Sequence, residues 1–411
     1  MRTFTLIWFG QLTSSVGTQM SEFALVLWAW EVTNSATALA LVGFFYGLPQ
    51  IPISLFAGLW VDRFNRKRLM FLGDATASLC TLAIGALYFT DSLLIWHIYL
   101  AAAINGGFGQ IQSLAYQTSV SLIVSPAQYT RANSMNSAVH YGSSIVAPAF
   151  AGFLYPLIQL PGILLIDLAT FGIAIITLLF VYIPQPLPSE KSGSIIHQLT
   201  FGLRHVWTRS ELRTLIVITA LFWFFHDLGE AIYDPMILAR TNGDARVLAS
   251  TATAAGIGGV TGAIILSAWG GPKQRTQGLF IGFIGAGLSK LVFGLGRSPL
   301  IWLPAQFCSS FNFPLLGSSE TALWMESTTP EIQGRVFAAN DLIIQIVSAL
   351  AALLAGPLAD RVLEPMMTSP AQPLGYIFGM GAGAGSSVLY VGCAIAMLAT
   401  GLVSRSLYNK A

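Results

Sequence analysis

Acidic side chains inside long apolar stretches are the residues of this chain best placed to do chemistry. Glu22 lies among Met20, Phe23 and Ala24, and no Lys or Arg stands within a helical turn of it. An ionisable group in hydrocarbon costs roughly 2.5 to 3.5 kcal/mol on insertion scales, so each one is a functional candidate. We expect the Glu22 carboxyl group to bind and release a proton. The alternative is a protonated side chain that only hydrogen-bonds to a neighbouring helix.

A second acidic group stands in a later apolar stretch and comprises His226, Asp227, Glu230 and Asp234. Spacings of three and four residues place the three acids on one face of a helix. They would repel one another strongly if all were ionised in a low dielectric. At least one is therefore expected to be neutral, paired with His226 or Lys290, or exposed to a water-filled cavity. Asp227 and Glu230 are further candidates for proton binding.

The overall composition is that of a chain embedded in lipid. Of the 411 residues, 54% are hydrophobic and 9% are charged, the mean hydropathy is +0.68, and the 40 glycines suit close helix packing. A net charge of +2 is too small to suggest nucleic-acid binding. Cys80, Cys308 and Cys393 lie in apolar stretches and predict neither a disulfide framework nor a metal site. The composition predicts a polytopic membrane protein.

Roughly twelve stretches are long and apolar enough to cross a bilayer, whose core of about 30 Å needs roughly 20 helical residues. They lie at residues 4–30, 37–61, 69–90, 94–123, 132–155, 161–183, 213–238, 248–270, 277–296, 300–326, 336–359 and 376–403. We therefore predict an all-α protein with an N-terminal six-helix bundle (1–183), a cytoplasmic linker (184–212) and a C-terminal six-helix bundle (213–411). Most of the 20 Lys and Arg residues then fall on the side of both termini. The positive-inside rule assigns that side to the cytoplasm.

A short basic run, GLWVDRFNRKR at residues 58–68, separates the second and third of these stretches. It resembles the G-x-x-x-D-R-x-x-R-R/K signature of the major facilitator superfamily, carried here by Gly58, Asp62, Arg63, Arg66 and Lys67. The resemblance implies the fold predicted above and a latch that closes the cytoplasmic side. The alternative is a solvated loop that is basic only for reasons of topology.

Further segments resemble the branch of this superfamily that contains bacterial macrolide-efflux and enterobactin-export proteins. The resemblance implies secondary active export of a small hydrophobic or amphipathic molecule, multidrug efflux by proton antiport, through alternating access in the plasma or inner membrane. It also implies that the proton gradient supplies the energy without a cofactor, and we expect the protein to act as a monomer. The matching segments are Asn34–Ala38, Arg131–Asn133, Asp167–Phe171, Gln333–Phe337 and Ala355–Arg361.

The predicted fifth crossing departs from the antiporter pattern G-x-x-x-G-P-x-x-G-G of the superfamily. Its places are taken here by Ser143, Ala147, Pro148, Ala151 and Gly152. Each change keeps a small residue, so close packing is expected to persist. Pro148 and Gly152 are the packing residues that we expect to matter most.

Other functions were weighed against transport. Import of a siderophore or nutrient uses the same fold. An intramembrane enzyme would need His226 with Asp227, or a serine with His140, and no nucleophile motif accompanies either. A non-transporting membrane protein would leave the acidic groups unexplained. The sequence has no G-x-x-x-x-G-K-S/T nucleotide site, so ATP is not expected to supply the energy. We expect a transporter and not an enzyme.

Two further expectations concern side chains around these sites. Asp74 is expected to brace the basic loop or Arg131. Phe222 and its three neighbours, together with aromatic residues near 307–313, could form an apolar wall for the cargo.

Overall fold

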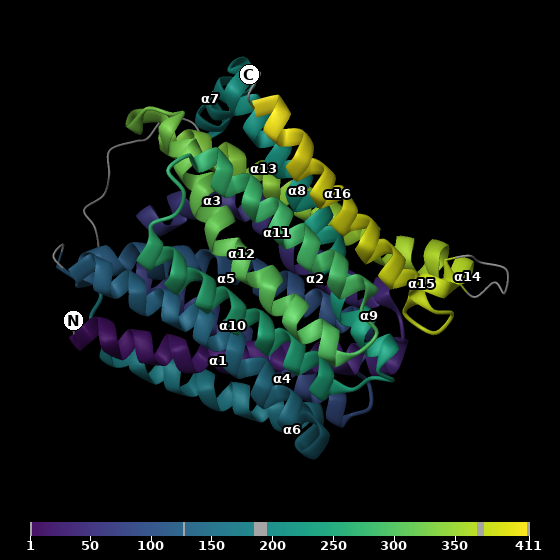
Figure 1. Cartoon of the computed structure of the whole chain (residues 1–411). Coiled ribbons are helices and arrows are strands. Elements are labelled where there is room, and N and C mark those ends of the chain that lie inside the picture. The colour runs from purple at the N-terminus through teal and green to yellow at the C-terminus, as the bar shows by residue number, and fades with distance from the viewer. Residues whose placement is uncertain (1, 126–127, 185–194, 368–373, 409–411) are drawn as a thin grey trace. The chain divides into compact units, whose positions relative to one another are not determined.

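The computed structural model describes residues 2–125, 128–184, 195–367 and 374–408, and these residues form helices joined by short turns, with no strand among them (Figure 1). The chain divides into two compact units. The N-terminal unit comprises Met1–Val32 and Val42–Ser192, and the C-terminal unit comprises Thr33–Leu41 and Gly193–Ala411. The start of the second helix therefore belongs with the C-terminal helices.

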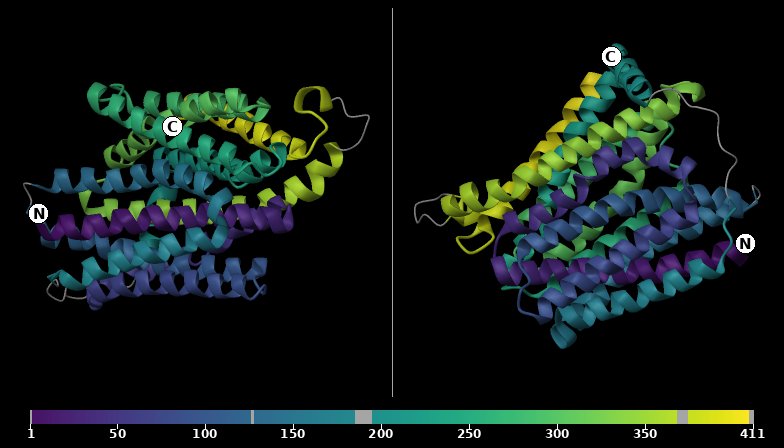
Figure 2. Two further views of the ribbon diagram at one scale, coloured as in Figure 1. Left: turned by 90° about the horizontal axis from the view of Figure 1, so that it is seen from below. Right: turned by 180° about the vertical axis from the view of Figure 1, so that it is seen from behind.

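The N-terminal unit is built from long helices that lie side by side (Figures 1 and 2). Helix α4 packs against α5 and α6, and α3 packs against α5. A Cβ atom on Gly10 would lie 2.2 Å from Thr177 Oγ1, so α1 also touches the later part of α6. The helices are α1 (Arg2–Thr33), α2 (Ala36–Gly47), α3 (Gln50–Arg63), α4 (Arg66–Phe89), α5 (Ile95–Ile123) and α6 (Tyr129–Phe180).

Helix α6 joins two of the predicted crossings, 132–155 and 161–183, in one continuous element. The break that the sequence predicts between them is present as a kink, since Gln159 has φ 56° and ψ −173°. Pro156 and Pro161 flank this residue. Because proline removes a backbone donor and clashes with the preceding turn, the pair accounts for the kink.

The C-terminal unit places α12 between α10 and α11, and α11 also packs against α16. The elements are α7 (Ile195–Thr208), α8 (Ser210–Glu230), α9 (Tyr233–Arg240), α10 (Ala245–Trp269), α11 (Arg275–Leu295), α12 (Pro299–Glu326), α13 (Pro330–Pro357), the π-helix η2 (Leu358–Leu363), α14 (Glu364–Met367), α15 (Gly375–Phe378) and α16 (Ala384–Tyr408). The last crossing begins at Ala384 and not at 376, because Gly379 and Gly383 have φ of 84° and 80°, which ends a right-handed helix.

The predicted linker contains a helix of its own. Helix α7 has 14 residues and packs against α13 and α8. Helix α8 begins at Ser210, three positions before the predicted crossing at 213. Residues 185–194 of the linker lie outside the described part of the chain.

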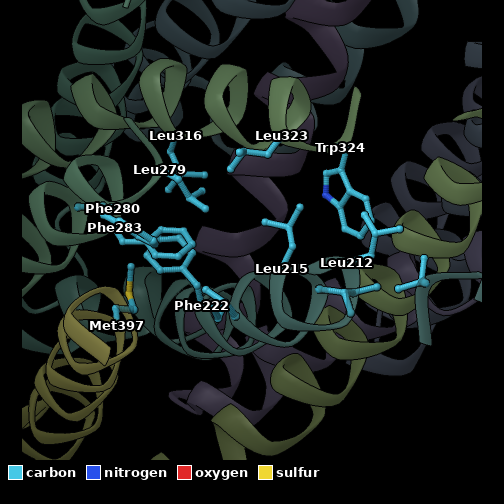
Figure 3. Close-up of a cluster of buried hydrophobic side chains, with 14 of the residues drawn as sticks. Leu212, Leu215, Phe222, Leu279, Phe280, Phe283, Leu316, Leu323, Trp324 and Met397 are labelled. Atoms are coloured by element: carbon cyan, nitrogen blue, oxygen red, sulfur yellow. The ribbon is translucent and has the colours of Figure 1, made fainter. Parts of the chain in front are cut away.

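The core of the C-terminal unit forms where α8, α11, α12 and α16 meet (Figure 3). The rings of Phe222 and Phe283 stack with centroids 4.0 Å apart, and Leu316 and Met397 are buried in the same cluster. The expectation that Phe222 lines a cargo cavity is therefore wrong. Its ring contributes to folding instead, because a fully buried aromatic side chain removes a large apolar area from water.

Arg240, at the end of α9, joins three turns of the C-terminal unit. Its guanidinium donates hydrogen bonds to the backbone oxygens of Gly296 at 2.9 Å, Phe378 at 2.8 Å and Gly383 at 3.4 Å. These oxygens follow or precede helix ends, where carbonyl groups lack intrahelical partners. One side chain thus satisfies acceptors from three separate connections.

Eight helical segments of the described chain are long and apolar enough to span a membrane. They are Ala36–Ala57, Arg66–Phe89, Gly142–Phe180, Ser210–Arg240, Ala245–Trp269, Arg275–Leu295, Ile332–Met367 and Ala384–Val403. The Gly142–Phe180 segment contains the Gln159 kink. Three other predicted crossings, those of α1, α5 and α12, are not among these segments. Helices α1 and α5 carry polar residues of the cavity described next, which lowers their hydropathy.

Candidate functional site

A polar cavity of about 930 Å³ lies within the N-terminal unit. It is bounded by α1, α4, α5 and α6, with Tyr46 contributed by the last turn of α2. Amide side chains make up much of its wall, and they are Gln11, Gln19, Asn105, Gln112, Gln117 and Asn136. Leu25, Ile84, Val139, Leu164 and Phe171 supply an apolar part. The cavity can therefore hold a molecule with both polar and apolar groups.

Three carboxyl groups reach this cavity from different helices: Glu22 from α1, Asp74 from α4 and Asp167 from α6. Glu22 is exposed to the cavity, whereas Asp74 and Asp167 are 1% and 2% exposed. Among the described residues that line the cavity, none is Lys, Arg or His. A cleft lined by one sign of charge with apolar surroundings concentrates ions of the other sign. The site is therefore able to attract cations, including protons.

Asp74 is held in place by a partner that the sequence did not suggest. Gln112 Nε2 donates a hydrogen bond to Asp74 Oδ1 at 2.5 Å. The expectation that Asp74 braces the basic loop or Arg131 is therefore wrong. The reason is geometric. Asp74 lies about two helical turns after the start of α4, on the face of this helix that packs against α5.

Asp167 was noted in the sequence only as part of a family segment, and the structure brings it to the cavity. Thr81 Oγ1 donates a hydrogen bond to Asp167 Oδ2 at 3.1 Å. A signal for this site was present in α1, where Gln11, Ser15, Thr18 and Glu22 recur at spacings of three and four. Such spacing marks one polar face of a helix, which in a membrane protein must meet protein or water.

The second acidic group, in the C-terminal unit, has partners. Lys290 on α11 is 3% exposed, and its Nζ lies 2.9 Å from Glu230 Oε2 and 3.4 Å from the Tyr390 hydroxyl. Asp227 accepts a hydrogen bond from the hydroxyl of Ser348 on α13. Its Oδ1 also lies 3.6 Å from His226 Nδ1. The structure therefore places Glu230 in an ion pair, one of the arrangements the sequence allowed.

Asp234 does not share a helix face with Asp227 and Glu230, contrary to the expectation from spacing. Helix α8 ends at Glu230 and α9 begins at Tyr233. Ile232, between them, has φ −106° and ψ 0°, which turns the chain out of the first helix. The periodicity argument failed because it assumed one continuous helix.

The basic loop between α3 and α4 is anchored by two of its five signature residues. Arg66 Nη1 donates to Thr118 O of α5 at 2.7 Å. Lys67 Nζ donates to Leu179 O at 2.9 Å and Val181 O at 2.7 Å, at the end of α6. A cation at a helix C-terminus satisfies free carbonyl groups and opposes the helix dipole. Arg63 is exposed, whereas for Gly58 and Asp62 the structure describes only the backbone, which belongs to α3.

Pro148 and Gly152, the residues of the expected packing segment, both lie in the first part of α6. Gly152 is buried, and Ala147 and Ala151 beside it are fully buried. This face of α6 is therefore covered closely by protein. Pro148 is half-buried.

A polar cavity between the helices of a membrane protein can hold a small molecule within the bilayer, as transport requires. The chain belongs to the Major Facilitator Superfamily, whose sequence profile matches residues 7–352. It is thus a multi-pass membrane transporter of small molecules and not an enzyme.

Similarity to individual proteins is distant but covers most of the chain. Macrolide efflux protein A of Streptococcus pyogenes is 24% identical over 363 residues, which are 87% of this chain and 90% of that protein. The multidrug efflux pump Tap of Mycolicibacterium fortuitum is 23% identical over 365 residues, with 86% and 88% covered.

Solved structures agree on the fold. A bacterial homologue of the iron transporter ferroportin, in an inward-facing state, gives a TM-score of 0.70 at 17% identity and covers 100% of this chain and 98% of that chain. A POT family transporter in complex with 5-aminolevulinic acid gives 0.72 at 12% identity, with 100% and 96% covered.

Proposed function

We propose that this protein exports a small amphipathic molecule across the cytoplasmic membrane in exchange for protons, by alternating access. Under this proposal the chain makes twelve crossings in two bundles, residues 1–183 and 213–411, joined by the linker 184–212. Both termini lie in the cytoplasm, and the protein acts as a monomer.

The observation that carries the proposal is the cavity of the N-terminal unit. Glu22 is exposed to it, and Asp74 and Asp167 line it, with no basic side chain among the lining residues that the structure describes. A carboxyl group that faces an accessible cavity can exchange protons with water, and a cargo bound beside it alters that exchange. Glu22 is the first candidate for proton coupling because it is the most accessible of the three.

Two acids of the C-terminal unit are further candidates for proton coupling. Glu230 is paired with Lys290, so its proton exchange would require the pair to open. Among the described residues, Asp227 accepts a hydrogen bond from the Ser348 hydroxyl and lies beside the His226 imidazole, without an ion pair to Lys or Arg. We propose Asp227 as the better coupling candidate of the two.

The basic loop supports a gating role. Arg66 and Lys67 hold the ends of α5 and α6 near the start of α4. We propose that Gly58, Asp62 and Arg63 complete a cytoplasmic latch, with Asp62 as its acidic member. The names of the distant relatives, macrolide and multidrug efflux proteins, support the direction of export.

The test is transport by purified protein in sealed liposomes that carry a pH gradient. Cargo candidates are added to the parent protein, Glu22→Gln, and Glu211→Gln as a control that removes an exposed acid of α8. We expect the gradient to drive uptake with the parent and the control but not with Glu22→Gln. No proton-driven movement of any tested compound by the parent would contradict the proposal.

Direction is tested with inverted membrane vesicles. An exporter accumulates its cargo in them when the interior is acidified, whereas an importer of a siderophore or nutrient depletes it. Asp62→Asn serves as the latch-deficient variant. Normal transport by that variant would leave the latch assignment wrong.

A further inference from the structure

The wall of the N-terminal cavity carries more hydrogen-bond acceptors than its own residues satisfy. Asp74 is 1% exposed and its Oδ2 has no hydrogen-bond partner among the described residues. Asn105 Oδ1, on the facing helix α5, is likewise without one. Because a buried acceptor that lacks a donor is costly, such atoms mark places where a ligand or water supplies the donor.

The charge of the cavity indicates the sign of that ligand. Glu22, Asp74 and Asp167 come from three helices, and no basic side chain stands among the described lining residues. A bound anion would add to the repulsion between these acids, whereas a bound cation relieves it. A purely apolar cation would leave the acceptors of Asp74 and Asn105 unsatisfied.

We infer that the cargo is an organic cation rich in hydrogen-bond donors, such as an amine with further amine or hydroxyl groups, held through Asp74, Asn105 and Asp167. This inference rests on the proposed transport function and narrows its cargo. The amine donates to the free oxygen of Asp74, and the apolar residues Leu25 and Phe171 accept its carbon skeleton. Gln112 positions Asp74 through its hydrogen bond.

The experiment is binding to the full-length protein in detergent by titration calorimetry, which needs neither a gradient nor transport. Two matched pairs of probes are used, spermidine with triacetylspermidine and glucosamine with N-acetylglucosamine. Acetylation keeps the skeleton and removes the charge. At least one amine is expected to bind roughly ten-fold or more tightly than its acetylated partner, since one charged hydrogen bond accounts for that factor.

Variants tie the binding to the cavity. Asp74→Asn keeps the shape and the bond from Gln112, and is expected to weaken amine binding about ten-fold. Glu211→Gln removes one charge elsewhere and should leave binding unchanged. If neither amine binds better than its acetylated partner, or if Asp74→Asn binds as the parent does, the inference is wrong. Binding without proton-driven transport would instead contradict only the proposed function.

A second and independent observation concerns the other end of the α2–α3 crossing, opposite the basic loop. Residues Gly356–Arg361 repeat the G-x-x-x-D-R pattern of Gly58–Arg63. Asp360 accepts hydrogen bonds from Ser35 Oγ at 2.7 Å, Ala36 N at 3.1 Å and Thr37 N at 2.8 Å. The carboxylate thus caps the first turn of α2, where free backbone donors and the helix dipole favour a negative charge.

The contact is close as well as polar. A Cβ atom on Gly356 would lie 2.3 Å from Thr37 Cα, so only glycine lets the two helices meet here. The π-helix η2 begins at Leu358, directly after this point, and places Asp360 over the helix end. Irregular turns of this kind recur at functional sites.

The geometry points to a second latch, in which Asp360 holds the start of α2 and closes the face of the membrane opposite the basic loop. Helix α2 carries Tyr46, which lines the cavity, so release of its first turn would change access to that cavity. The two copies of the pattern would then act on opposite faces.

Cysteine labelling tests this latch. Ser15→Cys, in the cavity wall, is introduced after Cys80, Cys308 and Cys393 are replaced by Ala, and an impermeant maleimide is applied to right-side-out and inverted vesicles. Asp360→Ala is expected to raise the labelling rate from one face by roughly 5- to 30-fold, the factor that loss of one capping interaction produces in a two-state equilibrium.

Arg361→Ala is the matched control, because Arg361 is the exposed neighbour of the capping residue, and its labelling should equal that of the parent. Gly356→Ala should raise the rate as Asp360→Ala does. Asp360→Asn, which keeps an acceptor of the same size, gives an intermediate rate and serves if the alanine variant does not fold. A rate unchanged in every folded variant would overturn the latch.

Discussion

The acids of the N-terminal cavity and Glu230 of the C-terminal unit have different partners. In the N-terminal unit, Glu22, Asp74 and Asp167 face a cavity whose described lining has no basic residue. In the C-terminal unit, Glu230 lies 2.9 Å from the ammonium group of Lys290, which is almost completely buried. Both groups consist of carboxyl groups on long helices. The difference lies in what each carboxylate has for a partner.

This contrast separates two uses of a costly residue. A paired carboxylate is stabilised by its cationic partner. Protonation or ligand binding at this carboxylate is unfavourable, because either event leaves the partner's charge uncompensated. A carboxylate without a cationic partner carries an uncompensated negative charge, which a proton or a cargo cation can neutralise. Function is therefore expected in the N-terminal cavity and stability at the Lys290 pair.

The largest expected effect comes from the same isosteric substitution made in both places. Glu230→Gln leaves the ammonium of Lys290 buried and uncompensated, and should lower the free energy of unfolding by about 3 to 5 kcal/mol. Asp74→Asn removes an acid that has no cationic partner and should leave stability unchanged or slightly higher. Thermal unfolding of the detergent-purified variants measures both.

A double variant shows whether the pair itself is responsible. Glu230→Gln with Lys290→Met removes both charges, so most of the lost stability should return. Glu230 is 47% exposed whereas Lys290 is 3% exposed, so Lys290→Met alone should cost less than Glu230→Gln alone. If Glu230→Gln and Asp74→Asn lowered the free energy of unfolding equally, the proposed difference between the two acids would be wrong.

A smaller effect is expected when the N-terminal cavity is given the partner that the C-terminal acid already has. Gln112→Lys places an ammonium group beside Asp74, whose Oδ1 now bonds Gln112. The pair should exclude cargo cations and lower proton-driven transport about ten-fold, with little change in stability. Gln112→Met, which removes the hydrogen bond without adding charge, is the control. Undiminished transport by the lysine variant would argue against a functional Asp74.

The smallest effect lies outside the membrane and extends the comparison to a basic residue. Burial, and then the nearby charge of Arg209, lower the pKa of His205 in α7 below its ordinary value of 6.5. The unfolded state then binds a proton that the folded state resists. The resulting stability is present above about pH 6.5 and declines as the pH falls below it.

Hydrogen exchange of the α7 amide groups at pH 5.5 and 7.5 measures this. Protection should be slightly weaker at the lower pH in the parent, and His205→Gln should remove the difference. If the variant keeps the same pH dependence, another group is responsible.

The sequence predicted an all-helical membrane protein correctly, because the length of an apolar stretch is a local property. The kink between Pro156 and Pro161 could also be inferred from neighbouring residues. The late start of α16 could not, since the positive φ angles of Gly379 and Gly383 depend on how the preceding segment packs. Apolar composition alone extended that helix too far.

Site residues were harder to predict because their partners are distant in the chain. Glu22 could be selected from its own surroundings, whereas Asp74 needed Gln112, which lies 38 residues away. Lys290 was one of two partner residues considered for the acids of α8, and 60 residues separate it from Glu230. Helix periodicity gives the face of a residue, but only the packing of helices shows what that face meets.

The hydrogen bonds of Arg240 couple the local stability of three connections in the C-terminal unit. The turn after α11, the end of α15 and the approach to α16 each depend on the same guanidinium for a donor. Heat or a substitution that displaces this side chain would loosen all three connections together. Proteases should then cleave the three connections with the same temperature dependence. A single residue would thus determine the rate of proteolysis in this part of the protein.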